Sequence, residues 1–190
     1  MTASTIKLIS TPEDHHLARM AALAFGLSTL EMAFPSPLPG VKPGLANIVT
    51  LIVLTRYGWR AAAWVTMLRV MAGGLLFGSF LAPGFFLSVS GALCSLVMLG
   101  ACSHLPTRWF GTVTQSILAA FAHITGQLCL AYFLLIPHVG LLYLVPIFAA
   151  AALLFGTVNG LIAARYLNTE KPFNHRDTET QRKTGEPYAI

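Results

Sequence analysis

The sequence predicts an all-α integral membrane protein: a six-transmembrane-helix bundle with both termini in the cytoplasm. Apolar residues make up 55% of the 190 residues and charged residues only 10%, whereas an average soluble domain has about 25% charged residues. No Asp or Glu occurs between Met32 and Arg165. Three regions follow from this pattern: a cytoplasmic lead (1–16), a membrane domain (17–167) and a polar cytoplasmic tail (168–190).

Proline and glycine motifs divide the membrane domain into six predicted helices. The motif PSPLPG ends the first helix, Ala82-Pro83-Gly84 ends the third, and Pro137 ends the fifth. Proline interrupts a helix because it lacks a backbone N–H and fixes φ. A span needs roughly 20 apolar residues plus a connection, so the domain has room for six. The predicted ranges are 17–34, 43–57, 60–81, 85–103, 111–136 and 141–167.

The second predicted helix is too short to cross a bilayer by itself. The stretch from Pro43 to Arg56 covers about 13 residues, or roughly 20 Å of rise, which is less than a hydrocarbon core of about 30 Å. We therefore expect the preceding segment, PSPLPGVKPG, to dip into the membrane. Irregular backbone at that depth must be shielded by protein or face a water-filled cavity. This segment therefore marks a candidate binding site.

Basic residues orient the predicted bundle. Because cytoplasmic loops carry an excess of Lys and Arg, the richer side and both termini are expected in the cytoplasm, within a multi-pass inner-membrane protein. The net charge of +5 is thus explained by topology and does not indicate a nucleic-acid partner. Lys42 lies alone on the outer side, and the inner side holds the basic tail with Lys7, Arg19, Arg56, Arg60, Arg108 and Arg165.

Ionisable side chains inside the membrane are candidate site residues, because each costs a few kcal/mol at mid-membrane. Arg69 follows Arg60 by nine residues, about 13 Å along a helix, which is too deep to reach water easily. Arg69 either binds an anion in an internal cavity or pairs with Glu31 or with exposed carbonyls. Glu31 is either interfacial, the counter-ion of Arg69 or a proton-sensitive residue of the site.

Other polar residues extend this candidate site. His123 and Gln127 share one face of the fifth predicted helix, where they either line a polar lumen or form interhelical hydrogen bonds. Asn47 lies at the start of the second predicted helix, close to Lys42. It either packs or caps this helix, or it faces a ligand bound at the helix N-terminus. We interpret Asn159 as structural. The predicted substrate-binding residues are Glu31, Lys42, Asn47, Arg69, His123 and Gln127.

Enzymatic chemistry has little support in this sequence. Paired carboxylates, carboxylate-bound magnesium and a Ser-His-Asp triad need acids that the membrane domain lacks. Cys94, Cys102 and Cys129 form no CxxC pair, so we interpret them as packing residues and expect neither a metal nor a cofactor. No GxxxxGK[ST] loop occurs, so energy for any transport must come from partners or a gradient.

Several motifs together carry a family resemblance. Ala18, Ala22 and Gly26 form a small-residue stripe that lets another helix approach closely, and an acid and a Pro-rich loop end the first helix. With PGVKPGLANIVTL, LRVMAGGLLFGSF and AHITGQL, residues 17–167 resemble the Gx transporter family, also labelled heptaprenyl diphosphate synthase component I. That family is similar to the S components of energy-coupling-factor transporters.

The resemblance implies a capping loop between the first two helices and an alanine stripe that meets a membrane coupling subunit, with ATPase subunits as further partners. Gly26 departs from alanine in that stripe. The chain is thus expected to be a substrate-binding membrane subunit for uptake of a small metabolite or cofactor precursor. The alternative is a non-catalytic accessory membrane subunit of a polyprenyl- or quinone-handling enzyme or redox complex. An enclosed cavity lined by Arg69 and His123 favours the first, and tight packing favours the second.

Overall fold

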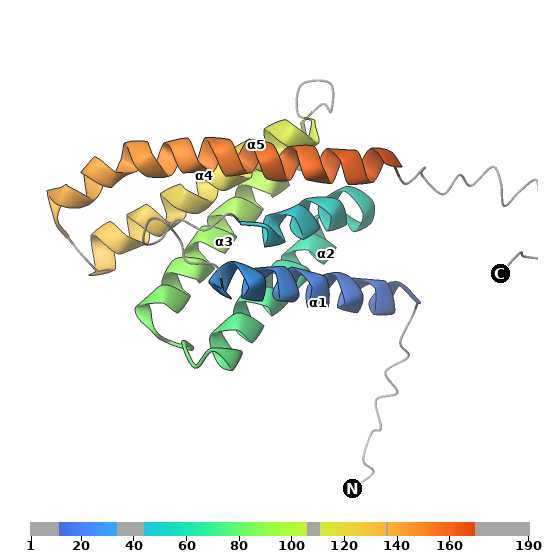
Figure 1. The fold of residues 1–190 in the computed structure, drawn as a ribbon, viewed down its shortest axis with the longest axis horizontal. Helices are drawn as coiled ribbons and strands as arrows, with labels where there is room; N and C mark the ends of the chain where they lie inside the picture. Colours follow the sequence, from blue (N-terminus) through green and yellow to red (C-terminus); the bar gives the residue numbers. More distant parts are fainter. Residues whose placement is uncertain (1–11, 34–43, 106–110, 136, 170–190) are drawn as a thin grey trace, which may run out of the picture.

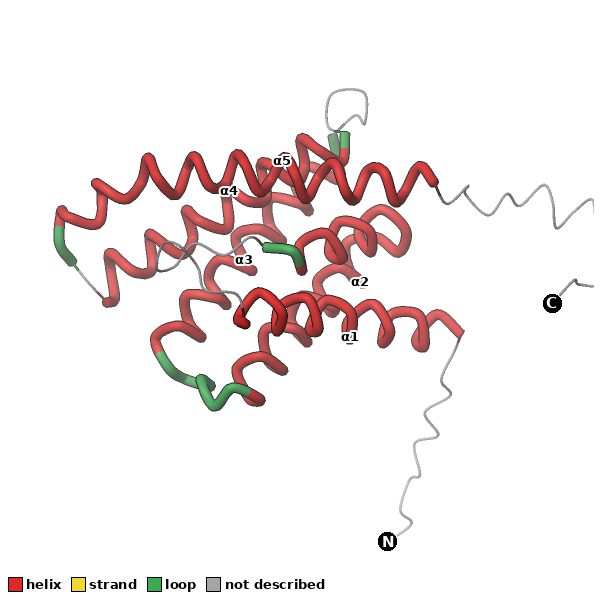
Figure 2. The backbone as a smooth tube through the Cα atoms, in the orientation of Figure 1, coloured by secondary structure: helices red, strands yellow, loops and turns green. Residues whose placement is uncertain are grey.

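The computed structural model describes residues 12–33, 44–105, 111–135 and 137–169, which are helical apart from short turns (Figures 1 and 2). No strand occurs among these residues, so the all-α prediction is confirmed for them. The elements are α1 (Pro12–Ala33), α2 (Ala46–Leu76), α3 (Pro83–Ser103), α4 (Thr112–Leu130), the π-helix η1 (Ala131–Leu135), the 3₁₀ helix η2 (Val139–Leu144) and α5 (Val145–Thr169).

α2 consists of two arms joined at Gly58. This residue has φ +82° and ψ 179°, a conformation that glycine adopts without a steric penalty. Thr50 Oγ1 lies 3.3 Å from Thr66 Oγ1, whereas one straight helix would separate these residues by about 24 Å. The arms 46–57 and 59–76 therefore run antiparallel and face each other. The break falls where the sequence separates the second and third predicted helices.

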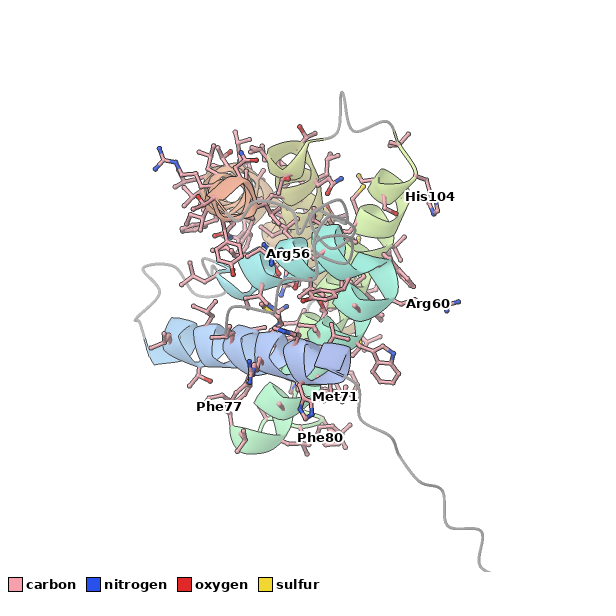
Figure 3. The ribbon with its side chains drawn as sticks, turned by 90° about the vertical axis from the view of Figure 1, so that its right-hand side faces the viewer. Arg56, Arg60, Met71, Phe77, Phe80 and His104 are labelled. Carbon is pink, nitrogen blue, oxygen red and sulfur yellow. The ribbon has the colours of Figure 1, made fainter. Side chains whose placement is uncertain are left out.

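The helices run back and forth, so the chain enters and leaves the bundle at one end. The first residues of α1, the bend of α2 and the last residues of α5 lie together at the right in Figure 1. Arg60 points outward at this end (Figure 3), and Arg56 lies 5.5 Å from the centre of the Tyr166 ring. The orientation of this end toward the cytoplasm, and with it the cytoplasmic position of both termini, stays a prediction.

Among the residues that the structure describes, three helical segments are long and apolar enough to cross a membrane: Pro83–Ser103, Thr112–Leu135 and Val139–Thr169. They indicate a membrane protein. α1 is less apolar because it opens with a polar turn that includes His15 and His16. α2 carries three arginines and is broken at Gly58. The prediction of six spans thus goes further than these three segments and stays a prediction.

Most observed helix ends differ from the predicted ones by a few residues. α1 begins at Pro12 and not near residue 17, as suits proline in a first helical turn. The second arm of α2 ends at Leu76 and not near residue 81, because Gly78 and Leu81 have φ values of +62° and +65°, which a right-handed helix cannot accommodate. α5 begins at Val145 and places a proline in its first turn, as expected.

Glycines let three helices pack closely. A Cβ at Gly156 of α5 would lie 3.0 Å from the Cα of Ile117 in α4, and a Cβ at Gly160 would lie 2.8 Å from the Cα of Val113. A Cβ at Gly126 of α4 would lie 2.6 Å from Cys94 Sγ in α3.

α1 packs on α2, and the apolar core surrounds the two arms of α2. The least accessible core residues are Leu51, Val53, Ala62, Val65 and Leu99.

Candidate functional site

Buried polar side chains converge on the interior of the bundle. Both arms of α2, together with α3, α4 and α5, each contribute one such residue, although the surrounding positions are apolar. Burying a hydroxyl or amide without a hydrogen bond is unfavourable, so five such residues in one interior need an explanation. We call this set the polar seam: Thr50, Thr66, Ser95, Ser116 and Asn159.

A small cavity lies within the polar seam, between α2, α3 and α4. Its polar lining consists of Asn47, Thr50, Ser95 and Ser116, and its volume is about 10 Å³. A buried water needs about this much space and two to four polar partners. The described residues therefore enclose room for a single water here, and not for a metabolite. A cavity lined by Arg69 and His123 would have favoured the uptake hypothesis, but neither residue lines this one.

Asn47 and Arg69 lie at the same level of the two α2 arms. Asn47 precedes Thr50 by one helical turn, and Arg69 follows Thr66 by one turn. Because Thr50 and Thr66 face each other across the antiparallel arms, the two turns run in the same direction away from the Gly58 bend. Arg69 is also close enough to His123 for the two side chains to interact electrostatically.

His123 is packed against α3 at a glycine. A Cβ at Gly91 would lie 2.8 Å from Cε1 and Nε2 of His123 and 2.9 Å from Cγ of Gln127. His123 makes a hydrogen bond with the Gly91 backbone, but its Nδ1 is buried with no hydrogen-bond partner within the described part of the chain. An unsatisfied buried nitrogen is destabilising, which makes this atom a candidate ligand contact.

Asn159 connects α5 to the start of α2. Its Nδ2 donates a hydrogen bond to the carbonyl oxygen of Gly44 at 3.1 Å. Asn47 is close by, because its Nδ2 would lie 3.2 Å from a Cβ at Gly44. This contact fits the structural role that we assigned to Asn159 from the sequence. It also places the start of α2 beside the polar seam.

The predicted binding residues divide into two groups. Arg69 interacts electrostatically with His123, Gln127 shares the Gly91 contact with His123, and Asn47 lines the cavity. Glu31 lies in the last turn of α1, but its side chain is outside the described residues, and Lys42 is outside them entirely. The binding role of all six stays a prediction.

The sequence analysis missed the hydroxyl residues of the polar seam and Gly91. Single Ser, Thr and Gly residues are common in apolar helices, and those of the seam form no local motif. Ser95 and Ser116 become notable only because α3 packs along α4 and brings them to one cavity. The available signal was the helical spacing of Ser116, Ala119 and His123, which places them on one face of α4.

The predicted partner stripe lies on the outer face of α1. Ala18, Ala22 and Gly26 are all exposed, and a Cβ at Gly26 would meet no atom within 4 Å. The opposite face of α1 packs on the core through Leu17, Met20, Ala21, Ala24 and Leu27. The stripe is therefore accessible in this structure, and its docking role stays a prediction.

Comparison with known proteins identifies the family. Residues 20–167 match the family model described as heptaprenyl diphosphate synthase component I. The chain belongs to this family. The match runs from the third turn of α1 almost to the end of α5 and includes the whole polar seam, so the resemblance found in the sequence is confirmed at the family level. No curated protein and no solved structure matches the chain significantly.

Proposed function

We propose that this component I family member is an S-component-like, substrate-binding membrane subunit for uptake of a small metabolite or cofactor precursor. The observation that carries the proposal is the buried Nδ1 of His123, which lacks a partner among the described residues and lies in the electrostatic range of Arg69. Buried ionisable groups in membrane bundles are rare and usually mark substrate or ion pathways. Here they adjoin a polar seam to which three further helical segments contribute.

The chemistry of the proposed site favours an anionic or carbonyl-bearing ligand. Arg69 supplies a positive charge, and the hydroxyls and amides supply hydrogen bonds. In residues 17–167 Glu31 is the only acid, so a second carboxylate does not compete for Arg69. In this proposal Glu31 and Lys42 contribute at the outer rim, on the evidence of the sequence alone.

The size of the cavity sets a requirement on this mechanism. About 10 Å³ accommodates roughly one water, so a metabolite enters only when the helices around the polar seam separate. Opening breaks the contact between Thr50 and Thr66 or moves α2 relative to α3 and α4. In this proposal the packed arrangement described above is the closed form of the subunit.

Partners complete the proposed mechanism. The exposed stripe of Ala18, Ala22 and Gly26 docks a membrane coupling subunit, because small residues allow close helix approach. ATPase subunits on the cytoplasmic side supply the energy, since the chain has no nucleotide-binding loop. The basic end of the bundle faces the cytoplasm of a six-span protein in the inner membrane.

A second candidate function is a non-catalytic accessory subunit of a polyprenyl- or quinone-handling membrane enzyme or redox complex. Two observations favour it: the interior cavity has the size of one water, and the family description names a synthase component. The chain would not itself elongate a prenyl diphosphate, because that reaction uses aspartate-rich magnesium sites and no acid occurs between Met32 and Arg165.

Purification from native membranes distinguishes the two functions. Mass spectrometry of co-purified proteins and small molecules should recover an ATPase pair and a bound metabolite under the uptake proposal. Recovery of a synthase or respiratory complex without ATPases would refute it. The Arg69→Ala variant should lose the bound metabolite while still inserting and folding, whereas the exposed Arg60→Ala control should retain it. Equal retention in both variants would remove Arg69 from the site.

A further inference from the structure

The small cavity of the polar seam has the features of an internal water site. Its volume of about 10 Å³ is close to the space that one buried water needs. Three helices surround it, and its polar lining comes from Asn47 and Thr50 of α2, Ser95 of α3 and Ser116 of α4. Because cavities that stay dry are lined by apolar groups, this lining favours an occupied cavity.

Two of the lining hydroxyls are buried and have no hydrogen bond to the described part of the chain. Ser95 is 6% exposed and Ser116 is 4% exposed, yet neither side chain bonds to another described residue. By contrast, Ser90 of α3 donates to the carbonyl oxygen of Gly126 at 2.8 Å. A buried hydroxyl without a partner is unfavourable, and an ordered water often supplies that partner. Because both hydroxyls line one cavity, a single water can satisfy both.

The first arm of α2 supplies a further partner. Thr50 Oγ1 donates to the carbonyl oxygen of Ala46 at 3.4 Å and lies 3.3 Å from Thr66 Oγ1. A hydroxyl has one donor and two acceptor lone pairs, so with Thr66 donating to it, Thr50 keeps one lone pair for another donor. A water in the cavity can donate to Thr50 while it accepts from Ser95 and Ser116. These contacts give it about three hydrogen bonds, as is typical of a buried water.

We propose that this cavity binds one ordered water, which links α2 to α3 and α4 through Thr50, Ser95 and Ser116. α2 has little direct contact with α4, whereas α3 packs along α4, so the water adds a polar connection between helices that barely touch. A sodium ion would also fit the volume, but a buried charge without a partner is costly and no Asp or Glu occurs between Met32 and Arg165. This inference is independent of the proposed function.

Radiolytic footprinting tests for the water in the intact protein. The chain is reconstituted in lipid nanodiscs and exposed to a short X-ray pulse, which converts water into hydroxyl radicals that oxidise adjacent side chains. Mass spectrometry then maps the oxidised residues. Leu51 and Leu99 line the cavity and are each 1% exposed, so radicals from bulk water do not reach them, and both should be oxidised by the bound water. Leu96 is 4% exposed and does not line the cavity, so it should stay unmodified as the internal control.

A variant that fills the cavity provides the second test. Ser116→Val removes one hydroxyl and places a methyl group in the cavity, so oxidation of the two cavity leucines should fall to the level of Leu96. If Ser116→Val does not fold, Ser95→Val fills the cavity from α3. The matched control is Ser88→Val, the same exchange at a position of α3 that does not line the cavity, and it should leave both leucines oxidised.

Several results would overturn the proposal. Unmodified cavity leucines in the unaltered protein would show that the cavity is dry. Equal oxidation of Leu96 would show that water enters the interior generally, without a specific site, and unchanged oxidation in the filled variants would lead to the same conclusion. Oxidation that appears only when sodium chloride is replaced by choline chloride would identify a sodium ion as the occupant.

Discussion

Gly91→Ala tests the central packing contact of the candidate site. The new Cβ would lie 2.8 Å from two atoms of the His123 ring and 2.9 Å from Gln127 Cγ. Overpacking of this kind costs about 1–3 kcal/mol, whereas the exchange of Gly for Ala inside a helix gains about 1 kcal/mol. We therefore expect a net change between about zero and a loss of 2 kcal/mol in the free energy of unfolding. The displaced imidazole should also weaken retention of the bound metabolite.

A matched control separates the clash from the helix effect. Gly73 lies within the second arm of α2, and a Cβ there would meet nothing within 4 Å. Gly73→Ala should therefore stabilise the protein by about 1 kcal/mol, so the two variants should differ by about 1–3 kcal/mol. Reversible unfolding in mixed micelles, followed by circular dichroism, measures this difference. Equal stability of the two variants, with unchanged metabolite retention, would show that His123 and Gln127 do not pack on Gly91 in this way.

Three further substitutions test the architecture by the same unfolding measurement. Gly58→Ala should destabilise the protein by about 1–2 kcal/mol through backbone strain at positive φ, and a gain in stability would contradict the bend. Thr66→Val should cost about 0.5–1.5 kcal/mol, because it removes one hydrogen bond while Thr50 Oγ1 still donates to the carbonyl oxygen of Ala46 at 3.4 Å; the double valine variant should cost less than the sum of the two single variants. Trp59→Phe removes a 2.9 Å hydrogen bond to the carbonyl oxygen of Leu96, worth about 1 kcal/mol, and no loss would indicate that water replaces it.

Local sequence signals predicted the fold class and most of the helices. The scarcity of charged residues and the long apolar runs predicted the fold class, and prolines with glycines marked most of the helix ends. The sequence placed the break of α2 between residues 57 and 60, but it did not show that Thr50 and Thr66 face each other across it, since this contact depends on how the two arms pack. The early end of α2 has the same origin, because Leu81 adopts its left-handed conformation only within the packed turn.

The candidate site was partly predictable for a related reason. The spacing of His123 and Gln127 placed both on one helix face, and the depth of Arg69 suggested an interior position. Their contact with Gly91 depends on how α3 and α4 are aligned, which no single helix encodes. The Ser and Thr residues of the polar seam are not distinctive in the sequence, because their shared position around one cavity depends on the packing of several helices. Cavity size is also a property of packing, so a metabolite-sized space could not be judged from the sequence.

The close glycine contacts divide the molecule mechanically. Where Gly126 meets Cys94 and where Gly156 and Gly160 meet α4, backbone and side chain touch with no long, adaptable side chain between them. Such joints resist sliding, so α3, α4 and α5 should move as one rigid body while α1 and α2 form the other. The hydroxyl-lined boundary between these bodies is then the natural plane of shear. Any signal that a bound molecule sends to the outer face of α1 must cross it.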